Sequence, residues 1–247
     1  MVEEINKAGK PYVFRYRGDN DYTLDEIERS YIYFQKRELL NDPFDSTPDL
    51  IELKKVNTKK LLIVLEKIAG RKKRNYIEKI LSPKKLEETV KESIPKFINK
   101  HGIACFSMLP GINMPMLANY SNNHQGLYLQ YNSQFDLKFF KGLRPMNYQK
   151  KLKKIAIEIA INENDIFEIF YLKQYNWAYE QELRLVKDNY GEFIINRKAL
   201  RNIICGYNCS DNYILRVLRA NRFNQHVSVW QMEKPNEQNR LKLNLIE

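Results

Sequence analysis

Short segments with strand-like alternation lie on both sides of a long, basic, helix-like stretch in this chain. Residues 10–17, KPYVFRYR, alternate three aromatic side chains with Val13 and two arginines, and residues 126–132, GLYLQYN, alternate in the same way. Further strands are predicted at residues 31–35, 102–109, 181–187, 202–207, 227–233 and 240–247. Together they predict an α+β fold: a single domain over residues 1–247 with a twisted, largely antiparallel mixed sheet and a basic helical insertion at residues 50–101.

Two helical predictions rest on local patterns. Thr23 and Glu26 have the spacing of a capping box and predict a short helix that ends near Ser30. Residues 150–173, KKLKKIAIEIAINENDIFEIFYLK, are long and amphipathic enough to predict one further helix or two.

The basic stretch is predicted to be helical over residues 58–100. Gly70 would end its first helix, Ser82 and Pro83 form a cap and first turn for the next, and Pro95 would bend or restart the last. From Lys54 to Lys100 there are 15 Lys or Arg against five Glu, so this stretch carries +10 of the net charge of +11. It contains the run Arg71, Lys72, Lys73, Arg74. Such a run is either a solvated helical face or a nucleic-acid interface, because concentrated positive charge attracts a phosphate backbone.

Composition limits the classes of protein that remain. Hydrophobic residues make up 43% of the 247 residues and aromatic residues 12%, values typical of a globular chain. Three cysteines without paired spacing fit neither a disulfide framework nor a zinc ribbon, and three histidines argue against a multi-histidine metal site. No apolar run approaches the roughly 20 residues that span a bilayer. We therefore expect a reduced, cytoplasmic protein without membrane contact.

Polar residues gather beside aromatic residues in four separate segments: residues 15–17, 33–45, 105–126 and 177–184. The segments contain no phosphate-binding loop, no glycine-rich dinucleotide fingerprint and no nucleophile elbow around Ser107, which argues against ATPases, kinases and Rossmann dehydrogenases. Asn41, Asp42 and Asp45 belong to the motif NDPFD, which is either a rigid turn anchored by Phe44 or part of a ligand site. In the second case its acids would orient an arginine of residues 15–17 or border a ribose.

The last segment contains WAYEQELRL, with Glu180 and Glu182 two residues apart. Alternate residues of a strand share a face, so we expect both carboxylates and Arg184 on one face and the neighbouring leucines in the core. The acids would either pair with Arg15 and Arg17 across adjacent strands or form the floor of an active site.

Several of these motifs together resemble a bacterial family of unknown function, DUF2971. The resemblance rests on FRYR, YIYFQ…LLNDPFDS, IACFS…MPMLANYSNNHQGLYLQYN and LKQYNWAYEQELRLV, and it covers about residues 12–210. The chain departs from the family pattern at residues 116–120, MLANY, where the family usually has MWSHY. The family supplies no established reaction.

An arginine, a serine and a Glu-x-Glu pair in this order also resemble the arginine–serine–glutamate class of ADP-ribosyltransferases, which have a split, strand-rich α+β fold. This resemblance implies that Arg15 or Arg17 binds the diphosphate of NAD and that Ser107 positions the ribose. Glu182 would hold the ribose 2′-hydroxyl and stabilise an oxocarbenium ion, and Glu180 would activate the acceptor. The remaining contacts to NAD would come from Tyr16, Tyr33, Asn41, Asp42, Tyr120 and His124, although an isolated histidine such as His124 is more often structural.

The leading hypothesis is therefore an NAD-using ADP-ribosyltransferase or NAD glycohydrolase that needs no metal, with nucleic acid as its acceptor. By analogy of fold, it would be a toxin or a phage-defence component, held in check by a regulatory protein partner. Two alternatives remain. In a metal-dependent nuclease, Asp42, Asp45, Glu180 and Glu182 would converge on a divalent cation. In a non-enzymatic nucleic-acid-binding module, residues 54–100 would carry the function and the acidic clusters would be structural.

Overall fold

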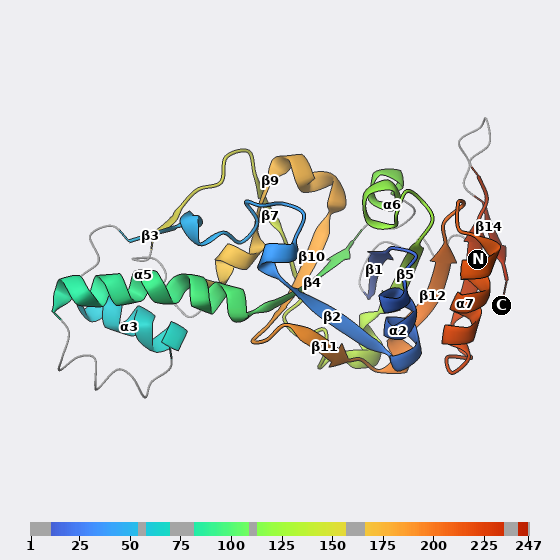
Figure 1. The fold of residues 1–247 in the computed structure, drawn as a ribbon, viewed down its shortest axis with the longest axis horizontal. Helices are drawn as coiled ribbons and strands as arrows, with labels where there is room; N and C mark the ends of the chain where they lie inside the picture. Colours follow the sequence, from blue (N-terminus) through green and yellow to red (C-terminus); the bar gives the residue numbers. More distant parts are fainter. Residues whose placement is uncertain are drawn as a thin grey trace.

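The computed structural model describes residues 11–53, 58–69, 82–108, 113–156, 166–234 and 242–246. The fold is α+β, as predicted, and is built on a twisted, mostly antiparallel mixed sheet (Figure 1). The strands of this sheet are β1 (Tyr12–Arg17), β2 (Tyr31–Lys36), β4 (Gly102–Ser107), β5 (Leu127–Asn132), β6 (Arg144–Pro145), β10 (Glu182–Lys187), β11 (Gly191–Ile194), β12 (Leu200–Cys205), β13 (Ser228–Met232) and β14 (Leu243–Leu245). Their order is β11-β2-β4-β1-β5-β12-β13-β14, with β10 also on β4 and β6 on β10; β12 and β13 are parallel.

Five α-helices and several short elements complete the described part of the chain. The helices are α2 (Asp21–Arg29), α3 (Thr58–Ala69), α5 (Pro83–Lys100), α6 (Met114–Tyr120) and α7 (Asp211–Asn221). Two parallel strand pairs lie outside the main sheet: β3 (Ile51–Glu52) with β8 (Ile155–Ala156), and β7 (Asn147–Gln149) with β9 (Leu172–Gln174). The 3-10 helices are η1 (Arg37–Leu39), η2 (Pro48–Leu50), η4 (Ser133–Asp136), η5 (Ile166–Tyr171), η6 (Tyr175–Glu180) and η7 (Arg197–Ala199).

The sheet is split along one edge of β4. On the opposite edge, β10 pairs with β4 over its whole length, from Glu182 beside Ser107 to Lys187 beside Gly102. On the split edge, β1 meets β4 only at Ser107, and β2 meets it only at the other end, where Gln35 lies beside Ile103. Among the described residues, 104–106 have no strand partner on that edge, so the sheet opens between β1 and β2.

The two faces of β1 are covered by different helices, as its alternation predicts. Val13 packs in a core with Leu24 of α2 and Val217 of α7. On the other face, Phe14 and Tyr16 pack with side chains of α6. Helices α3 and α5 form a third core at one end of the molecule, and α7 lies at the other end (Figure 1).

Some local predictions are wrong. The side chain of Asn20, not that of Thr23, caps α2 and accepts a hydrogen bond from the Thr23 amide at 3.0 Å, which leaves Glu26 free to point at the sheet. Helix α5 begins at Ser82–Pro83 as expected but runs through Pro95, because the buried side chains around it, such as Ile94 and Ile98, hold it in the third core.

The long helix predicted for residues 150–173 is also wrong. Residues 155–156 pair with β3, residues 166–171 form the buried 3-10 helix η5, and residues 172–174 are β9, so tertiary pairing overrides the helical pattern; residues 157–165 lie outside the described part. Helix α7 was not predicted. The predicted helix end at Gly70 falls outside the described residues.

Candidate active site

A cavity of about 240 Å³ lies at the split in the sheet. Its walls come from β1, β2, β4, α6, β9, η6, β10 and the loop at residues 39–45. Ten of the eleven side chains predicted to be catalytic or to bind NAD line it: Arg15, Tyr16, Arg17, Tyr33, Asn41, Asp42, Ser107, Tyr120, Glu180 and Glu182. Segments separated by more than 160 residues in the sequence thus contribute to one site.

The two glutamates converge in a way that the strand pattern did not predict. Strand β10 begins at Glu182, whereas Glu180 is the last residue of η6, and Gln181 between them has a left-handed backbone with φ of 41°. Two hydrogen bonds hold this reversal: the Ser107 hydroxyl donates to the carbonyl of Glu180 at 2.8 Å, and the Met108 amide donates to that of Gln181 at 2.9 Å. The left-handed conformation, which costs an ordinary residue about 1–2 kcal/mol, turns both carboxylates toward the same lysine.

That lysine is Lys173 of β9, which was not predicted from the sequence. Its ammonium lies 2.5 Å from Glu180 Oε2 and 2.8 Å from Glu182 Oε2, and it is buried with both acids. The ring of Trp177 lies beside it, with its centroid 5.2 Å from Nζ. Nothing local distinguishes Lys173 from the other lysines of the chain, because its role depends on the folding of η6 back over β9.

Arg184 extends this cluster to the NDPFD loop. Its Nε donates to Glu182 Oε1 at 2.7 Å, and its two terminal nitrogens each donate to one oxygen of Asp45 at 2.8 Å. Glu182 and Arg184 share a face of β10, and Leu185 on the other face is buried in the core, as predicted. The alternative in which Asp45 orients Arg15 or Arg17 is wrong, since Asp45 orients Arg184 instead.

Arg15 and Arg17 pair with an acid on the other face of the sheet. Glu26 of α2 lies 3.3 Å from Arg15 Nε and 2.8 Å from Arg17 Nη2, so the alternative in which the two arginines pair with Glu180 and Glu182 is wrong. Arg15 Nη2 also donates to the carbonyl of Tyr33 at 3.1 Å, which places its guanidinium across the split. Arg15 is only 6% exposed, and its Nη1 has no hydrogen-bond partner among the described residues.

Asp42 presents a second polar atom without a partner. Its Oδ1 accepts a hydrogen bond from the Phe44 amide at 2.9 Å, as in the predicted turn, but its Oδ2 has no partner within the described ranges, although the residue is only 5% exposed. Phe44 is 57% exposed and does not anchor the turn; Asp45 does so through Arg184. Buried polar atoms are normally hydrogen-bonded to protein or ordered water, so an unpaired donor and an unpaired acceptor on one cavity are positions where water or a polar ligand could bind.

The environments of the two glutamates drive their pKa values apart. Burial raises the pKa of Glu180, an effect that the Lys173 ammonium and the hydroxyl of Tyr120, which donates to Glu180 Oε1, only partly offset. Burial also opposes ionisation of Glu182, but Arg184 and Lys173 outweigh it and lower its pKa to about 2. Burial and the neighbouring Glu180 raise the pKa of Tyr120, so its hydroxyl remains a donor. A carboxylate that stays ionised beside one that binds a proton more readily is a common arrangement for acid–base chemistry.

Other predicted residues lie elsewhere. His124 is not part of the cavity: its backbone is left-handed, its ring stacks on Tyr207 at 4.6 Å, and burial lowers its pKa. Residues 71–74, predicted to bind nucleic acid, lie outside the described residues. In the described part of the chain, no group of three or more His, Cys, Asp or Glu side chains is arranged to hold a metal ion, and no helix there is both long and apolar enough to cross a membrane.

Comparisons of the chain with protein-family models, with curated proteins and with solved structures find no match. The resemblances to DUF2971 and to the ADP-ribosyltransferases therefore remain predictions that rest on the residues quoted above.

Proposed function

We propose that this protein is an enzyme that cleaves the bond between nicotinamide and ribose in NAD, either to transfer ADP-ribose or to hydrolyse NAD. The observation that supports the proposal is the gathering of ten predicted side chains from all four polar segments around one cavity. A cavity of about 240 Å³ lies below the usual range of about 300–1,000 Å³ for whole ligands, so it would take the nicotinamide–ribose half of NAD.

The proposed roles follow from the charges around the cavity. When the bond between C1′ and the nicotinamide nitrogen breaks, the electron pair leaves with nicotinamide and positive charge develops on the ribose. The ionised carboxylate of Glu182 would stabilise that charge. Water or the acceptor would then bond to C1′ and give up its proton to the carboxylate of Glu180, whose raised pKa suits a proton acceptor.

At the other side of the cavity, Arg15 would bind an NAD phosphate through its free Nη1, and Asp42 Oδ2 would accept a hydrogen bond from a ribose hydroxyl. Ser107 would act indirectly, by holding the backbone of Glu180 rather than by touching the ribose. Tyr33 and Tyr120 would flank the nicotinamide ring.

The metal-dependent nuclease is the weaker candidate. Its metal would need Asp42, Asp45, Glu180 and Glu182 in one coordination sphere, but the oxygens of the last three acids are already bound by Lys173, Arg184 and Tyr120. The acceptor that we propose is nucleic acid, and a toxin or defence role under control of a partner protein would suit such an activity.

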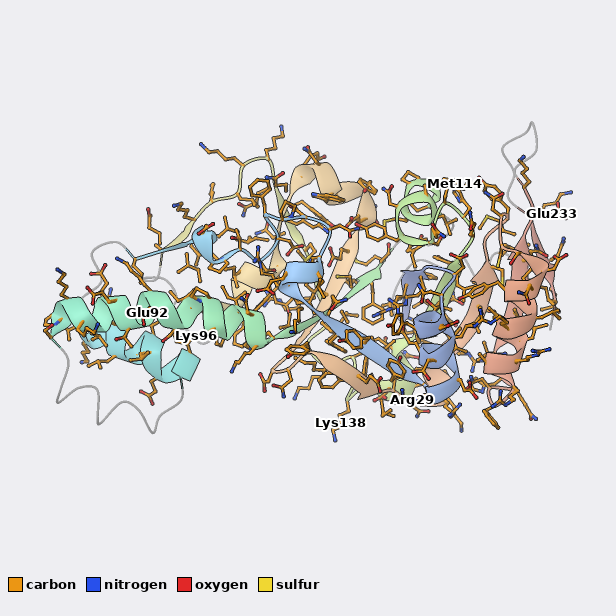
Figure 2. All side chains as sticks on the ribbon, viewed as in Figure 1. Arg29, Glu92, Lys96, Met114, Lys138 and Glu233 are labelled. Atoms are coloured by element: carbon orange, nitrogen blue, oxygen red, sulfur yellow. The ribbon has the colours of Figure 1, made fainter. Side chains whose placement is uncertain are left out.

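The test is NAD consumption and nicotinamide release by the purified wild type, by Glu182→Gln, and by Glu92→Gln as a control. Glu92 is an exposed residue of α5 (labelled in Figure 2) and does not line the cavity, so the control makes the same chemical change outside the site. Total RNA and DNA are supplied as acceptors. We expect turnover in the wild type and the control, and a loss of at least about 100-fold in Glu182→Gln.

Thermal melting must show that all three proteins are folded, and mass spectrometry must show that no inhibitory partner has copurified. Absence of turnover in a folded, partner-free wild type would overturn the proposal. Turnover that survives in Glu182→Gln would leave an NAD-cleaving enzyme but remove Glu182 from its chemistry.

A further inference from the structure

A second surface combines positive charge with exposed aromatic rings, at the α7 end of the molecule. We call it the α7 patch, and its residues are Phe135, Arg197, Lys198, Arg201, Arg219 and Phe223. Phe223 is 58% exposed and Phe135 41% exposed, and a guanidinium lies over each ring. The Phe223 centroid lies 4.5 Å from the guanidinium carbon of Arg222 and 5.9 Å from that of Arg197; the Phe135 centroid lies 5.2 Å from that of Arg201.

Hydrogen bonds join the segments of this patch into one surface. The side chain of Asn196 donates to the carbonyl of Phe135 at 3.0 Å, which fastens η4 to η7. The next residue, Arg197, donates to the side chain of Asn224 at 3.3 Å, which fastens η7 to the chain that follows α7. The two rings therefore sit on neighbouring, fixed backbone.

The positive charge of the patch is mostly uncompensated. Arg216 of α7 and Arg222, which follows the helix, form ion pairs with Asp21 and Glu28 of α2. Within the part of the chain that the structure describes, no carboxylate forms an ion pair with any of the four cationic residues of the patch, Arg197, Lys198, Arg201 and Arg219. On α5, Lys85 and Lys91 are paired with glutamates of the same helix, whereas Lys84 and Lys96 form no ion pair with the described residues and so offer a matched control.

We infer that the α7 patch binds single-stranded nucleic acid. Exposed aromatic faces can stack on unpaired bases, and the adjacent guanidinium groups can bind the phosphates on either side. A duplex keeps its base faces covered, and an acidic peptide would use the charges but not the rings. This inference is independent of the proposed NAD chemistry, and it differs from the sequence-based expectation, which assigned nucleic acid to residues 54–100.

Because a protein with a net charge of +11 binds nucleic acid nonspecifically, the test compares surfaces. Binding of a fluorescein-labelled oligonucleotide of about twelve deoxythymidines is followed by anisotropy between roughly 50 and 200 mM salt. The double variant Lys198→Gln/Arg219→Gln removes two exposed charges from the patch, and Lys84→Gln/Lys96→Gln removes two exposed charges from α5. Lys96 lies at the opposite end of the molecule from α7 (Figure 2).

Log affinity falls with log salt by about 0.7 for each phosphate contact with a single strand. The patch variant, which loses two charges, should therefore make this slope less steep by about 1.4, and the α5 variant should leave it almost unchanged. Phe223→Leu should weaken binding roughly 5- to 100-fold through loss of base stacking, whereas Phe44→Leu, an equally exposed phenylalanine elsewhere, should not. A hairpin duplex should compete poorly.

Three outcomes would overturn the inference. The first is a slope that changes only in the α5 variant, which would return the interface to residues 54–100. The second is that polyglutamate, added as a competitor, displaces the labelled oligonucleotide as well as the unlabelled oligonucleotide does, while Phe223→Leu binds normally. That result would indicate an acidic protein partner. The third is equal binding of all variants, which would show that the protein binds only through its overall charge.

Discussion

Replacing Lys173 by methionine should show how much the buried cluster contributes to stability. Methionine has a similar length but no charge, so the change leaves Glu180 and Glu182 facing each other without the ammonium that lies 2.5 and 2.8 Å from their oxygens. Breaking a buried ion pair by removing one partner typically costs about 3–5 kcal/mol, because the remaining charge is uncompensated. Glu182 keeps Arg184, so most of the cost should arise at Glu180.

The second substitution, Glu180→Gln, tests that assignment. In Lys173→Met/Glu180→Gln the remaining acid, Glu182, is still paired with Arg184, so the double variant should recover about 2 kcal/mol of the loss. Unfolding in guanidinium chloride at neutral pH measures all the free energies. Loss of the lysine should raise the folded-state pKa of Glu180 further. An acid with a raised folded-state pKa destabilises the fold only at a pH where the unfolded chain ionises it. The loss of unfolding free energy in Lys173→Met should therefore shrink as the pH falls to about 5.

A cost below about 1 kcal/mol for Lys173→Met would contradict the reasoning, since it would mean that water already screens the cluster. Recovery that is absent from the double variant would likewise show that Glu180 is not the acid that the lysine neutralises.

Three further predictions concern stability and are checked by the same unfolding assay. Because the pKa of Glu182 is lowered to about 2 in the folded protein, it should contribute about 3 kcal/mol above pH 4.5 that is lost as the pH falls from there toward 2, and Glu182→Gln should lack that part of the pH dependence. Asp45→Asn should lower the free energy of unfolding by about 3–5 kcal/mol, because it removes a carboxylate charge that pairs with the buried Arg184. The neighbouring Phe44→Ala should change it by no more than about 0.5 kcal/mol, because Phe44 is exposed. Gly126→Ala should cost at least about 1–3 kcal/mol, because its Cβ would lie 2.1 Å from a carbonyl oxygen of β1; an unchanged stability would show that the strand can shift.

The sequence by itself determined the local elements whose pattern is set by backbone geometry. Alternation along β1 placed Val13 in one core and Phe14 in another, because successive side chains of a strand point to opposite faces. The same rule placed Glu182 and Arg184 together, and the Ser82–Pro83 pair marked the start of α5. The polar segments that form the cavity were also visible, since the sequence shows polar residues gathered beside aromatic ones in four places.

Tertiary structure decided what those residues contact. The sequence could not show that β1 and β2 share one edge of β4 and leave a split, because strand pairing depends on register between distant segments. It could not show that Gln181 has a left-handed backbone that turns Glu180 toward Lys173. Nor could it show that Glu26 pairs with Arg15 and Arg17, or that Asp45 pairs with Arg184. Periodicity reports which face a side chain occupies; which opposite charge it meets in a buried site is set only when the chain has brought distant segments together.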